Sequence, residues 1–183
     1  MQTLFNGSLQ GKRVQRVHTP APIVTLLKEL WGRIECDPCS SPDPDNLVDA
    51  KIRIMPPENG CKYATKVPTG EVDERGRFIY VDAPPGLDRW PLNTYVNPEF
   101  SDLEPWFRQF AESWEVAILA PARAHRKWFR EHLRKAIIAD LNPVKFVGHT
   151  QAFPSPLVLA YRGDHFRTFR HLVDSYGIGE ARP

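Results

Sequence analysis

The sequence predicts an α/β domain of three layers, in which helices cover both faces of a mostly parallel sheet. Helical patterns of about ten residues alternate with short apolar strands, an order typical of right-handed βαβ units. Residues 115–119 form an almost wholly apolar run, which is the pattern of a strand buried on both faces in a parallel sheet. The chain of 183 residues is long enough for one domain with a sizeable core and too short for two ordinary ones.

The amino-terminal part of the chain divides into an arm and the start of the domain. Residues 1–17 are polar and are expected to form an arm, whereas residues 18–183 form a single domain. Thr19-Pro20 opens the first helix, because Pro is favoured at the first helical position and apolar side chains then recur at helical spacing. Gly32 is the expected end of this helix.

The next segment is rich in turn-forming residues. A short strand over residues 33–36 ends in Asp37-Pro38-Cys39-Ser40. The Pro, Asp and Asn content then predicts a loop over residues 41–57, with a short helix near residues 47–52. Alternation of β-forming residues predicts a hairpin insertion over residues 56–82, which is either a cover for a functional site, a reader of nucleic acid or a plain surface excursion.

The second half of the chain is more regular. Thr94–Val96 is expected to be a strand that runs into Asn97-Pro98-Glu99-Phe100, and Ser101 or Asp102 can cap the helix after it. Most large aromatic residues of this half are expected in the core, Trp114 among them. The remaining predicted elements are, in order, the helix with an apolar stripe from Trp106 to Trp114, the strand 115–119, a helix from about Arg123, strands 144–147 and 157–161, and a helix from Phe166 to Gly177.

Composition excludes several classes of protein. Residues of the set AVILMFWYC make up 42% of the chain and charged residues 25%, which is the composition of a globular chain and not of a disordered one. The longest uncharged apolar stretch, residues 116–122, is far shorter than a membrane span, and the amino terminus lacks the apolar core of a signal peptide. We therefore expect a soluble, cytoplasmic protein with no membrane partner.

Cysteine usage argues against two further classes. The three cysteines are Cys36, Cys39 and Cys61, an odd number with one C-x-x-C pair. An odd count is unlike a disulfide scaffold, and no second C-x-x-C or His pair completes four zinc ligands. Buried reduced thiols and no bound metal are the expectation.

The distribution of charge favours a polyanionic partner. The formal net charge is only +2, but residues 123–183 contain 11 Lys and Arg against five Asp and Glu. The preceding 122 residues contain 13 bases and 17 acids. Such a basic region is typical of nucleic-acid binding, with a solvated helix face as the plain alternative. The residues expected to contact DNA are Arg123, Arg126, Lys127 and Arg130.

Two strand ends carry polar turns that are stiffened by proline. In an open α/β sheet, ligands bind beyond the carboxyl ends of the strands, where Asp37-Pro38-Cys39-Ser40 and Asn97-Pro98-Glu99-Phe100 are predicted to lie. The first turn offers a carboxylate and a hydroxyl to a cationic or amino-acid-like cofactor. The second offers an amide oxygen, a carbonyl on a restrained proline and an aromatic face.

The second turn has the groups that methylation of an exocyclic base amine requires. Such an amine is a poor nucleophile, because its lone pair is delocalised into the ring. The Asn97 side-chain oxygen and the Pro98 carbonyl can each accept one N–H and so bias the nitrogen towards tetrahedral geometry. Phe100 can stack on an extruded base, a contact worth about 1–3 kcal/mol. An ordinary turn after a strand is the plain alternative.

An ordered series of motifs resembles the phage-type DNA N6-adenine methyltransferases, a family that depends on S-adenosylmethionine (AdoMet) and is common in phages and prophages. The series covers about residues 18–162, which makes it more specific than any one tetrapeptide. Its members are Thr19-Pro20, Asp37-Pro38-Cys39-Ser40, Gly86-Leu87 with Trp90, Asn97-Pro98-Glu99-Phe100-Ser101, Trp106, the strand Val116–Leu119 entering Ala120-Pro121-Ala122, Trp128-Phe129, and Phe153-Pro154-Ser155-Pro156-Leu157.

The resemblance implies a Rossmann-like methyltransferase domain that transfers a methyl group from AdoMet to adenine N6 in double-stranded DNA, without a metal, in the cytoplasm of a bacterial host. Protection of phage DNA against restriction is the usual purpose of this family. The implied AdoMet-binding residues are Thr19, Pro20, Asp37, Pro38, Cys39 and Ser40. The implied catalytic residues, which hold the base, are Asn97, Pro98 and Phe100.

Two positions depart from the family pattern. The usual tetrapeptide is Asn-Pro-Pro-Tyr, and here its last two positions are Glu99 and Phe100; the acid that usually precedes Gly-Leu is replaced by Pro85. Phe100 keeps the stacking face, whereas Glu99 brings a flexible anionic side chain next to DNA phosphates. Two alternatives therefore stand beside adenine methylation. One is methylation of another amine, such as cytosine N4 or a modified base; the other is a diverged methyltransferase fold that binds DNA or a protein without turnover.

Overall fold

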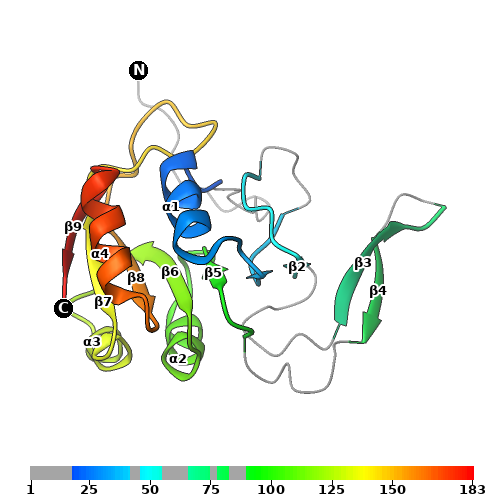
Figure 1. Ribbon diagram of the computed structural model, residues 1–183, viewed down its shortest axis with the longest axis horizontal. Coiled ribbons are helices and arrows are strands. Elements are labelled where there is room, and N and C mark those ends of the chain that lie inside the picture. Colours follow the sequence, from blue (N-terminus) through cyan, green and yellow to red (C-terminus); the bar gives the residue numbers. More distant parts are fainter. Residues whose placement is uncertain (1–17, 42–45, 55–65, 75–77, 83–89) are drawn as a thin grey trace.

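The computed structural model (Figure 1) describes residues 18–41, 46–54, 66–74, 78–82 and 90–183. The helices are α1 (Ala21–Trp31), α2 (Glu104–Glu112), α3 (Lys127–Leu133) and α4 (Phe166–Ser175). The strands are β1 (Cys36–Asp37), β2 (Ile52–Arg53), β3 (Lys66–Val72), β4 (Phe78–Asp82), β5 (Thr94–Val96), β6 (Val116–Pro121), β7 (Ile137–Leu141), β8 (Leu157–Arg162) and β9 (Gly179–Arg182). Within these ranges, no helix is both long enough and apolar enough to span a membrane.

Seven of the strands form one mixed sheet in the order β2-β1-β5-β6-β8-β7-β9. The strands from β2 to β6 pair in parallel. β8 pairs antiparallel with both β6 and β7, and β9 pairs antiparallel with β7. The predicted α/β class is therefore confirmed, but the sheet is parallel only at its β2 end, and the expectation of a mostly parallel sheet is wrong for the other half. Hydrophobic pattern reveals burial and leaves strand direction open, which is why the sequence missed the antiparallel strands.

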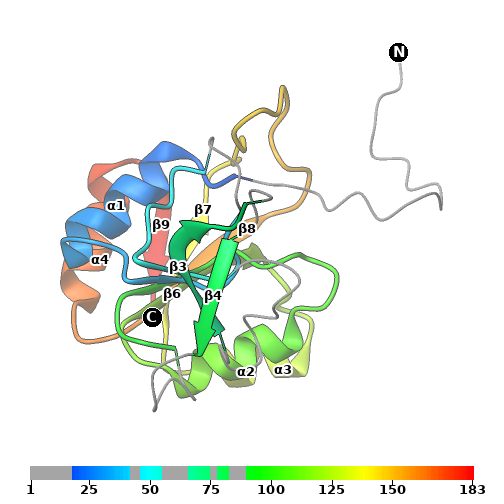
Figure 2. The same ribbon diagram turned by 90° about the vertical axis from the view of Figure 1, so that its right-hand side faces the viewer.

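Helices cover both faces of this sheet and complete three layers (Figure 2). Every residue of β6 is buried, and its side chains alternate between two cores. Ala117 and Leu119 pack with the apolar residues of α1 and α4, whereas Ile118 and Ala120 pack with those of α2 and α3. The continuous apolar run in the sequence is thus the consequence of a strand covered on both sides.

The first helix begins and ends where the sequence predicts. Pro20 precedes α1 in an extended conformation, and Gly32 follows it with φ of +78°, a left-handed conformation that favours glycine. Ile23, Val24, Leu26, Leu27 and Leu30 are the buried residues of this helix.

Several elements or boundaries differ from the sequence prediction. One of them is β7, which was not predicted as a strand. Residues 47–52 form no helix: residues 46–50 have no regular secondary structure, and β2 begins at Ile52. Residues 144–147 form only an isolated bridge between His18 and Val147 in place of a strand. The third helix starts at Lys127 and not near Arg123. β9 was not predicted, because Gly-Glu-Ala-Arg has no apolar alternation to indicate an edge strand.

The hairpin insertion is present as the antiparallel pair β3–β4, in which Lys66 lies opposite Asp82. It stands beyond the β2 end of the sheet in Figure 1. The arm 1–17 and residues 56–65 and 75–77 of the predicted hairpin, Cys61 among them, lie outside the described residues. Pro85 and Gly86-Leu87, which follow the hairpin, do so as well.

A buried carboxylate closes the amino end of β6. Glu115 is only 7% exposed and has φ of +49°. Its side chain accepts hydrogen bonds from Trp31 Nε1 at 3.0 Å, from Tyr161 Oη at 2.8 Å and from the Asp164 backbone N–H at 2.6 Å. Because these donors come from α1, β8 and the turn after β8, one side chain ties three segments together at the edge of the sheet that holds the amino end of β6.

Candidate functional site

Two predicted turns leave the sheet side by side. β1 pairs in parallel with β5 through Cys36 and Thr94, and neighbouring strands lie about 4.8 Å apart. The turn that starts at Asp37 and the turn that starts at Asn97 therefore emerge at the same edge. This edge carries the carboxyl ends of the parallel strands, which is where the sequence places a ligand site.

Asp37 is a buried carboxylate at the end of β1. It is 4% exposed, and the Cys39 backbone N–H donates to its Oδ1 at 3.0 Å. Burial raises the pKa of Asp37 to about 6, against the opposing effect of the Cys39, Ser40 and Asn46 hydrogen bonds and of the Arg53 charge. The carboxylate is thus ionised at neutral pH in a place that disfavours its charge.

Arg53 braces the turn that follows Asp37. Its Nε donates to Ser40 Oγ at 3.0 Å and its Nη2 to the Ser41 carbonyl at 2.6 Å. Asn46 Nδ2 donates to the same Ser40 Oγ at 3.4 Å. Sequence reasoning missed Arg53 and Asn46; the only available signals were a base inside a β pattern and an Asn inside a Pro-rich loop.

Thr19 connects the start of the domain to the second turn. Asn97 Nδ2 donates to Thr19 Oγ1 at 3.2 Å, and Thr19 Oγ1 shares a hydrogen bond of 2.8 Å with Tyr95 Oη. Thr19 is 2% exposed and Tyr95 is fully buried, and burial raises the pKa of Tyr95 well above its usual range, so that its hydroxyl stays protonated. The hydrogen bond that Thr19 accepts from the Asn97 amino group therefore orients the Asn97 amide. Pro20, which the resemblance also assigns to AdoMet binding, is half-buried beside it.

The other residues of the second turn differ in exposure. Pro98 is buried, Glu99 is exposed and Phe100 is half-buried. The Phe100 ring meets Phe153 edge to face at a centroid distance of 5.3 Å and lies 6.4 Å from Phe146. The aromatic group at this edge is therefore held by two other rings.

Both of those rings come from the loop 142–156, which follows β7. The Val147 backbone N–H donates to the His18 carbonyl at 3.2 Å, and the Phe153 N–H donates to the Val144 carbonyl at 2.8 Å. The loop is thus fastened to the residues just before α1 and covers the edge where the two turns meet. The motif series includes Phe153 but assigns it no function. For Phe146, the sequence indicates only an apolar residue.

The four bases predicted to contact DNA follow the carboxyl end of β6, the parallel neighbour of β5. Arg126, Lys127 and Arg130 are exposed and Arg123 is half-buried. Arg130 Nη1 donates to the Ala124 carbonyl at 2.9 Å, and Lys127 forms an ion pair of 3.6 Å with Glu131, one helical turn away. Arg123 and Arg126 thus lie in the turn that leaves the strand next to β5, and Lys127 and Arg130 lie on the first turn of α3.

The cysteines of the described ranges give no metal cluster. In those ranges no three His, Cys, Asp or Glu side chains gather in a metal-binding arrangement. Cys36 is a buried thiol whose pKa is raised to about 12, mainly by burial, and Cys39 is half-buried in the turn after Asp37. Pro38 is buried between them.

No family model, curated protein or solved structure matches the chain. A function for this chain is therefore inferred from the residues at the carboxyl edge of β1, β5 and β6.

Proposed function

We propose that the protein is an AdoMet-dependent methyltransferase that modifies the exocyclic N6 amine of adenine in DNA, on a methyltransferase-like domain. The observation that carries the proposal is the meeting of three motif segments at one edge. Asn97 donates a hydrogen bond to Thr19, which lies 78 residues earlier, and Asp37 stands on the neighbouring strand. These are the segments that the motif series names for AdoMet and for the target base.

The base side of the proposal depends on the orientation of Asn97. Its amino group donates to Thr19, which orients the amide, and its side-chain oxygen is the acceptor that we assign to an N–H of a base amine. The backbone carbonyl of Pro98, the next residue, is a second acceptor. Two acceptors aimed at one nitrogen favour its tetrahedral form, which is the nucleophilic form. AdoMet, when bound, supplies a methyl group on a positively charged sulfur, and holding the amine in line with it is mainly a matter of positioning.

The cofactor side depends on Asp37. A carboxylate can accept about four hydrogen bonds, and burial makes its charge costly unless donors or a cation are nearby. The hydroxyl and ammonium groups of AdoMet are ligands of that kind, so Asp37 and the turn through Ser40 suit this molecule. Thr19 already forms hydrogen bonds with Asn97 and Tyr95, and we assign it to positioning the amide.

The DNA side depends on the bases after β6. Arg123, Arg126, Lys127 and Arg130 stand beyond the strand next to Asn97, so phosphates of a duplex with its target base at Asn97 would come within their reach. Lys and Arg contacts of this kind set the position of the duplex and carry no sequence information.

The first experiment is a transfer assay with labelled AdoMet and unmethylated DNA, followed by digestion and identification of the labelled nucleoside. We expect labelled N6-methyladenine from the unaltered protein. Asn97→Ala should give none while retaining the rise in melting temperature that AdoMet causes, because the variant loses the base-side acceptor and the hydrogen bond to Thr19 but leaves Asp37 and its turn unchanged. Asn142→Ala, which removes an exposed amide near Gly177, is the matched control and should transfer normally. Normal transfer by Asn97→Ala would refute the mechanism.

The exposed Glu99 supports a second candidate, a diverged fold that binds DNA or a protein without turnover. Its carboxylate stands in the turn that should face DNA, where phosphates repel it. Folded protein that neither labels DNA nor is stabilised by AdoMet would favour this role. Transfer that appears only in Glu99→Pro would identify this residue as the cause. Label in N4-methylcytosine or in a modified nucleoside would keep the enzyme and change its acceptor.

A further inference from the structure

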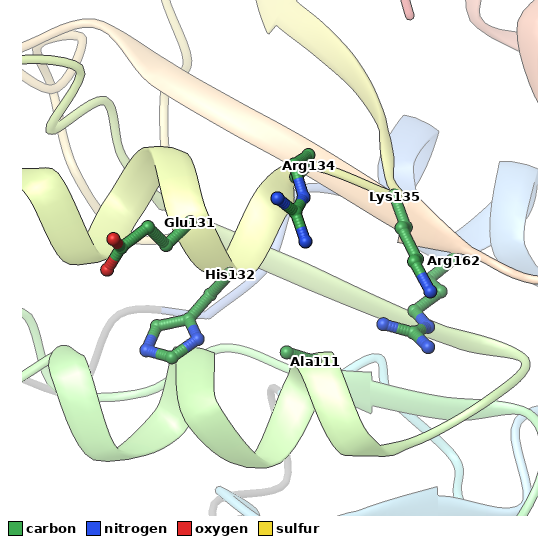
Figure 3. A pocket seen from close by; sticks show the side chains of 6 residues that line it. All are labelled: Ala111, Glu131, His132, Arg134, Lys135 and Arg162. Atoms are coloured by element: carbon green, nitrogen blue, oxygen red, sulfur yellow. The ribbon is translucent and has the colours of Figure 1, made fainter.

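A basic pocket lies at the amino end of β6, across the sheet from the candidate site. Its volume is about 180 Å³, and it opens between the ends of α2, α3 and β8 (Figure 3). The lining residues are Ala111, Glu131, His132, Arg134, Lys135 and Arg162. Because Arg162 pairs with Val116 at the start of β6 and a strand of six residues is about 20 Å long, this pocket is separate from the Asn97 turn.

Three cations of the pocket, Arg134, Lys135 and Arg162, form no ion pair with a carboxylate among the residues that the structure describes. Glu131, the acid of the lining, pairs with Lys127 on the exposed side of α3. Figure 3 shows Arg162 and Lys135 extending into the same hollow, with Arg134 entering from the α3 side. Like charges that share a pocket repel one another unless an anion lies between them.

The Arg162 side chain is positioned by an aromatic ring, but one of its nitrogen atoms lacks a hydrogen-bond partner among the described residues. Its guanidinium carbon lies 5.4 Å from the centroid of the Trp114 ring, a cation–π arrangement. Its Nε is buried and has no hydrogen-bond partner within the described ranges. Because the Trp114 ring positions the guanidinium and its Nε has no acceptor among the described residues, Arg162 is preorganised for an external acceptor.

We propose that this pocket binds a phosphate group. A guanidinium fork can donate two parallel hydrogen bonds to two phosphate oxygens, and the lysine ammonium adds a compact positive charge. Sites for drug-sized molecules have volumes of about 300–1,000 Å³, so this smaller pocket suits one compact anion and not a whole nucleotide. The phosphate is either a free phosphate compound or part of a nucleic-acid backbone. The inference does not depend on methyl transfer, because the pocket lies at the other end of the strands.

The test is calorimetric titration with inorganic phosphate, at an ionic strength held constant with sodium chloride. The unaltered protein should show saturable binding. The double variant Arg134→Gln/Lys135→Gln changes two exposed side chains and should bind about tenfold more weakly or worse, since two charge-assisted contacts are lost. Arg162→Lys keeps the charge, loses the fork and should also weaken binding. Arg170→Gln is the matched control, because Arg170 is exposed on α4 at the other face of the sheet.

A second titration with a short DNA duplex distinguishes the sources. A duplex that displaces phosphate and binds the double variant more weakly than the Arg170→Gln control identifies a backbone phosphate. Phosphate binding with duplex affinity equal in these two variants identifies a free phosphate compound. Either result supports the pocket. Folded protein that binds neither phosphate nor duplex through these residues overturns the proposal, as does equal weakening by Arg170→Gln.

Discussion

The hydroxyl of Thr19 joins two side chains that lie 76 and 78 residues further along the chain, Tyr95 and Asn97. This hydroxyl is buried, and both of its described hydrogen-bond partners are side chains of the protein. Removing it leaves the Tyr95 hydroxyl without this partner and the Asn97 amide without its anchor. Both stability and the chemistry proposed for Asn97 should respond.

Thr19→Val tests this pair of roles, because valine has nearly the shape of threonine without the hydroxyl. We expect a loss of about 1–3 kcal/mol in the free energy of unfolding, the cost of unsatisfied buried polar groups. The rate of methyl transfer should fall while the affinity for AdoMet changes little. Urea unfolding and single-turnover kinetics measure the two effects. Thr25→Val, at an exposed position of α1, should change neither.

The ionised carboxylate of Asp37 destabilises the folded protein, because it is buried. Its pKa in the folded protein, about 6, is above its ordinary value of 3.8, so the folded state binds the proton more tightly than the unfolded state. The contribution of Asp37 to the free energy of unfolding is therefore most favourable below about pH 4, and it falls as the pH rises through about 6. Above that range the ionised carboxylate costs about 3 kcal/mol.

Asp37→Asn should therefore melt at a higher temperature than the unaltered protein at pH 7.5. The gain should be roughly 6–12 °C and should disappear near pH 4, where Asp37 itself is protonated in the folded protein. The stabilisation by AdoMet should be lost at the same time. Thermal melts across pH, with Asp49→Asn at an exposed site as control, measure this. If Asp37→Asn melted at a lower temperature than the unaltered protein at pH 7.5, the predicted direction of the effect would be wrong. A gain in melting temperature that is larger at pH 4 than at pH 7.5 would also contradict it.

At the scale of elements, the Glu115 network depends on a glycine. A side chain at Gly163 would collide with Tyr161 Oη and with the Glu115 carboxylate. Gly163→Ala should therefore lower the free energy of unfolding by about 1–3 kcal/mol through overpacking. Tyr161→Phe in the same chain removes one of the colliding atoms, so the double variant should lose less than the sum of the single losses. Additive losses in urea unfolding would show that the two sites are independent.

The sequence predicted the regular elements where side-chain period and local chemistry agree. α1 lies between Pro20 and Gly32, and β5 and β6 match their apolar runs. Trp114 was expected in the core because its spacing continues the stripe of α2, but α2 ends at Glu112 and Trp114 is 43% exposed. Periodicity cannot show where a helix stops without a capping residue, and here Ser113 is extended.

The candidate site was predicted in part for the same reason. Strand ends followed by Asp-Pro and Asn-Pro located Asp37 and Asn97 at one edge, because parallel neighbours end together. The contacts of Thr19 and the ring of Phe146 depend on long-range packing, which leaves no local signal in the sequence. Phe100 was predicted as a stacking face, and the structure adds that Phe153 already contacts its ring.

At the scale of the whole molecule, the basic residues after β6 should make DNA binding depend on salt. If all four bases contact phosphates, the logarithm of the binding constant should fall with the logarithm of salt concentration with a slope of about −3.6. Arg123→Gln and Arg126→Gln should each reduce the magnitude of that slope by about one. Fluorescence titrations at several salt concentrations measure it. Slopes unchanged from the parent protein in both variants would place the DNA elsewhere.

The hydrogen bond between Thr19 and Asn97 also bears on when the protein becomes competent. The candidate site needs residues before α1, the turns after β1 and β5, and the rings of Phe146 and Phe153. Contacts so far apart in sequence form late, because chain entropy must be lost before they are gained. During synthesis on the ribosome, the edge stays incomplete until the loop 142–156 has emerged. Ligand binding at this edge should therefore require a chain that extends at least through the loop 142–156, so that shorter nascent chains should not bind the ligand.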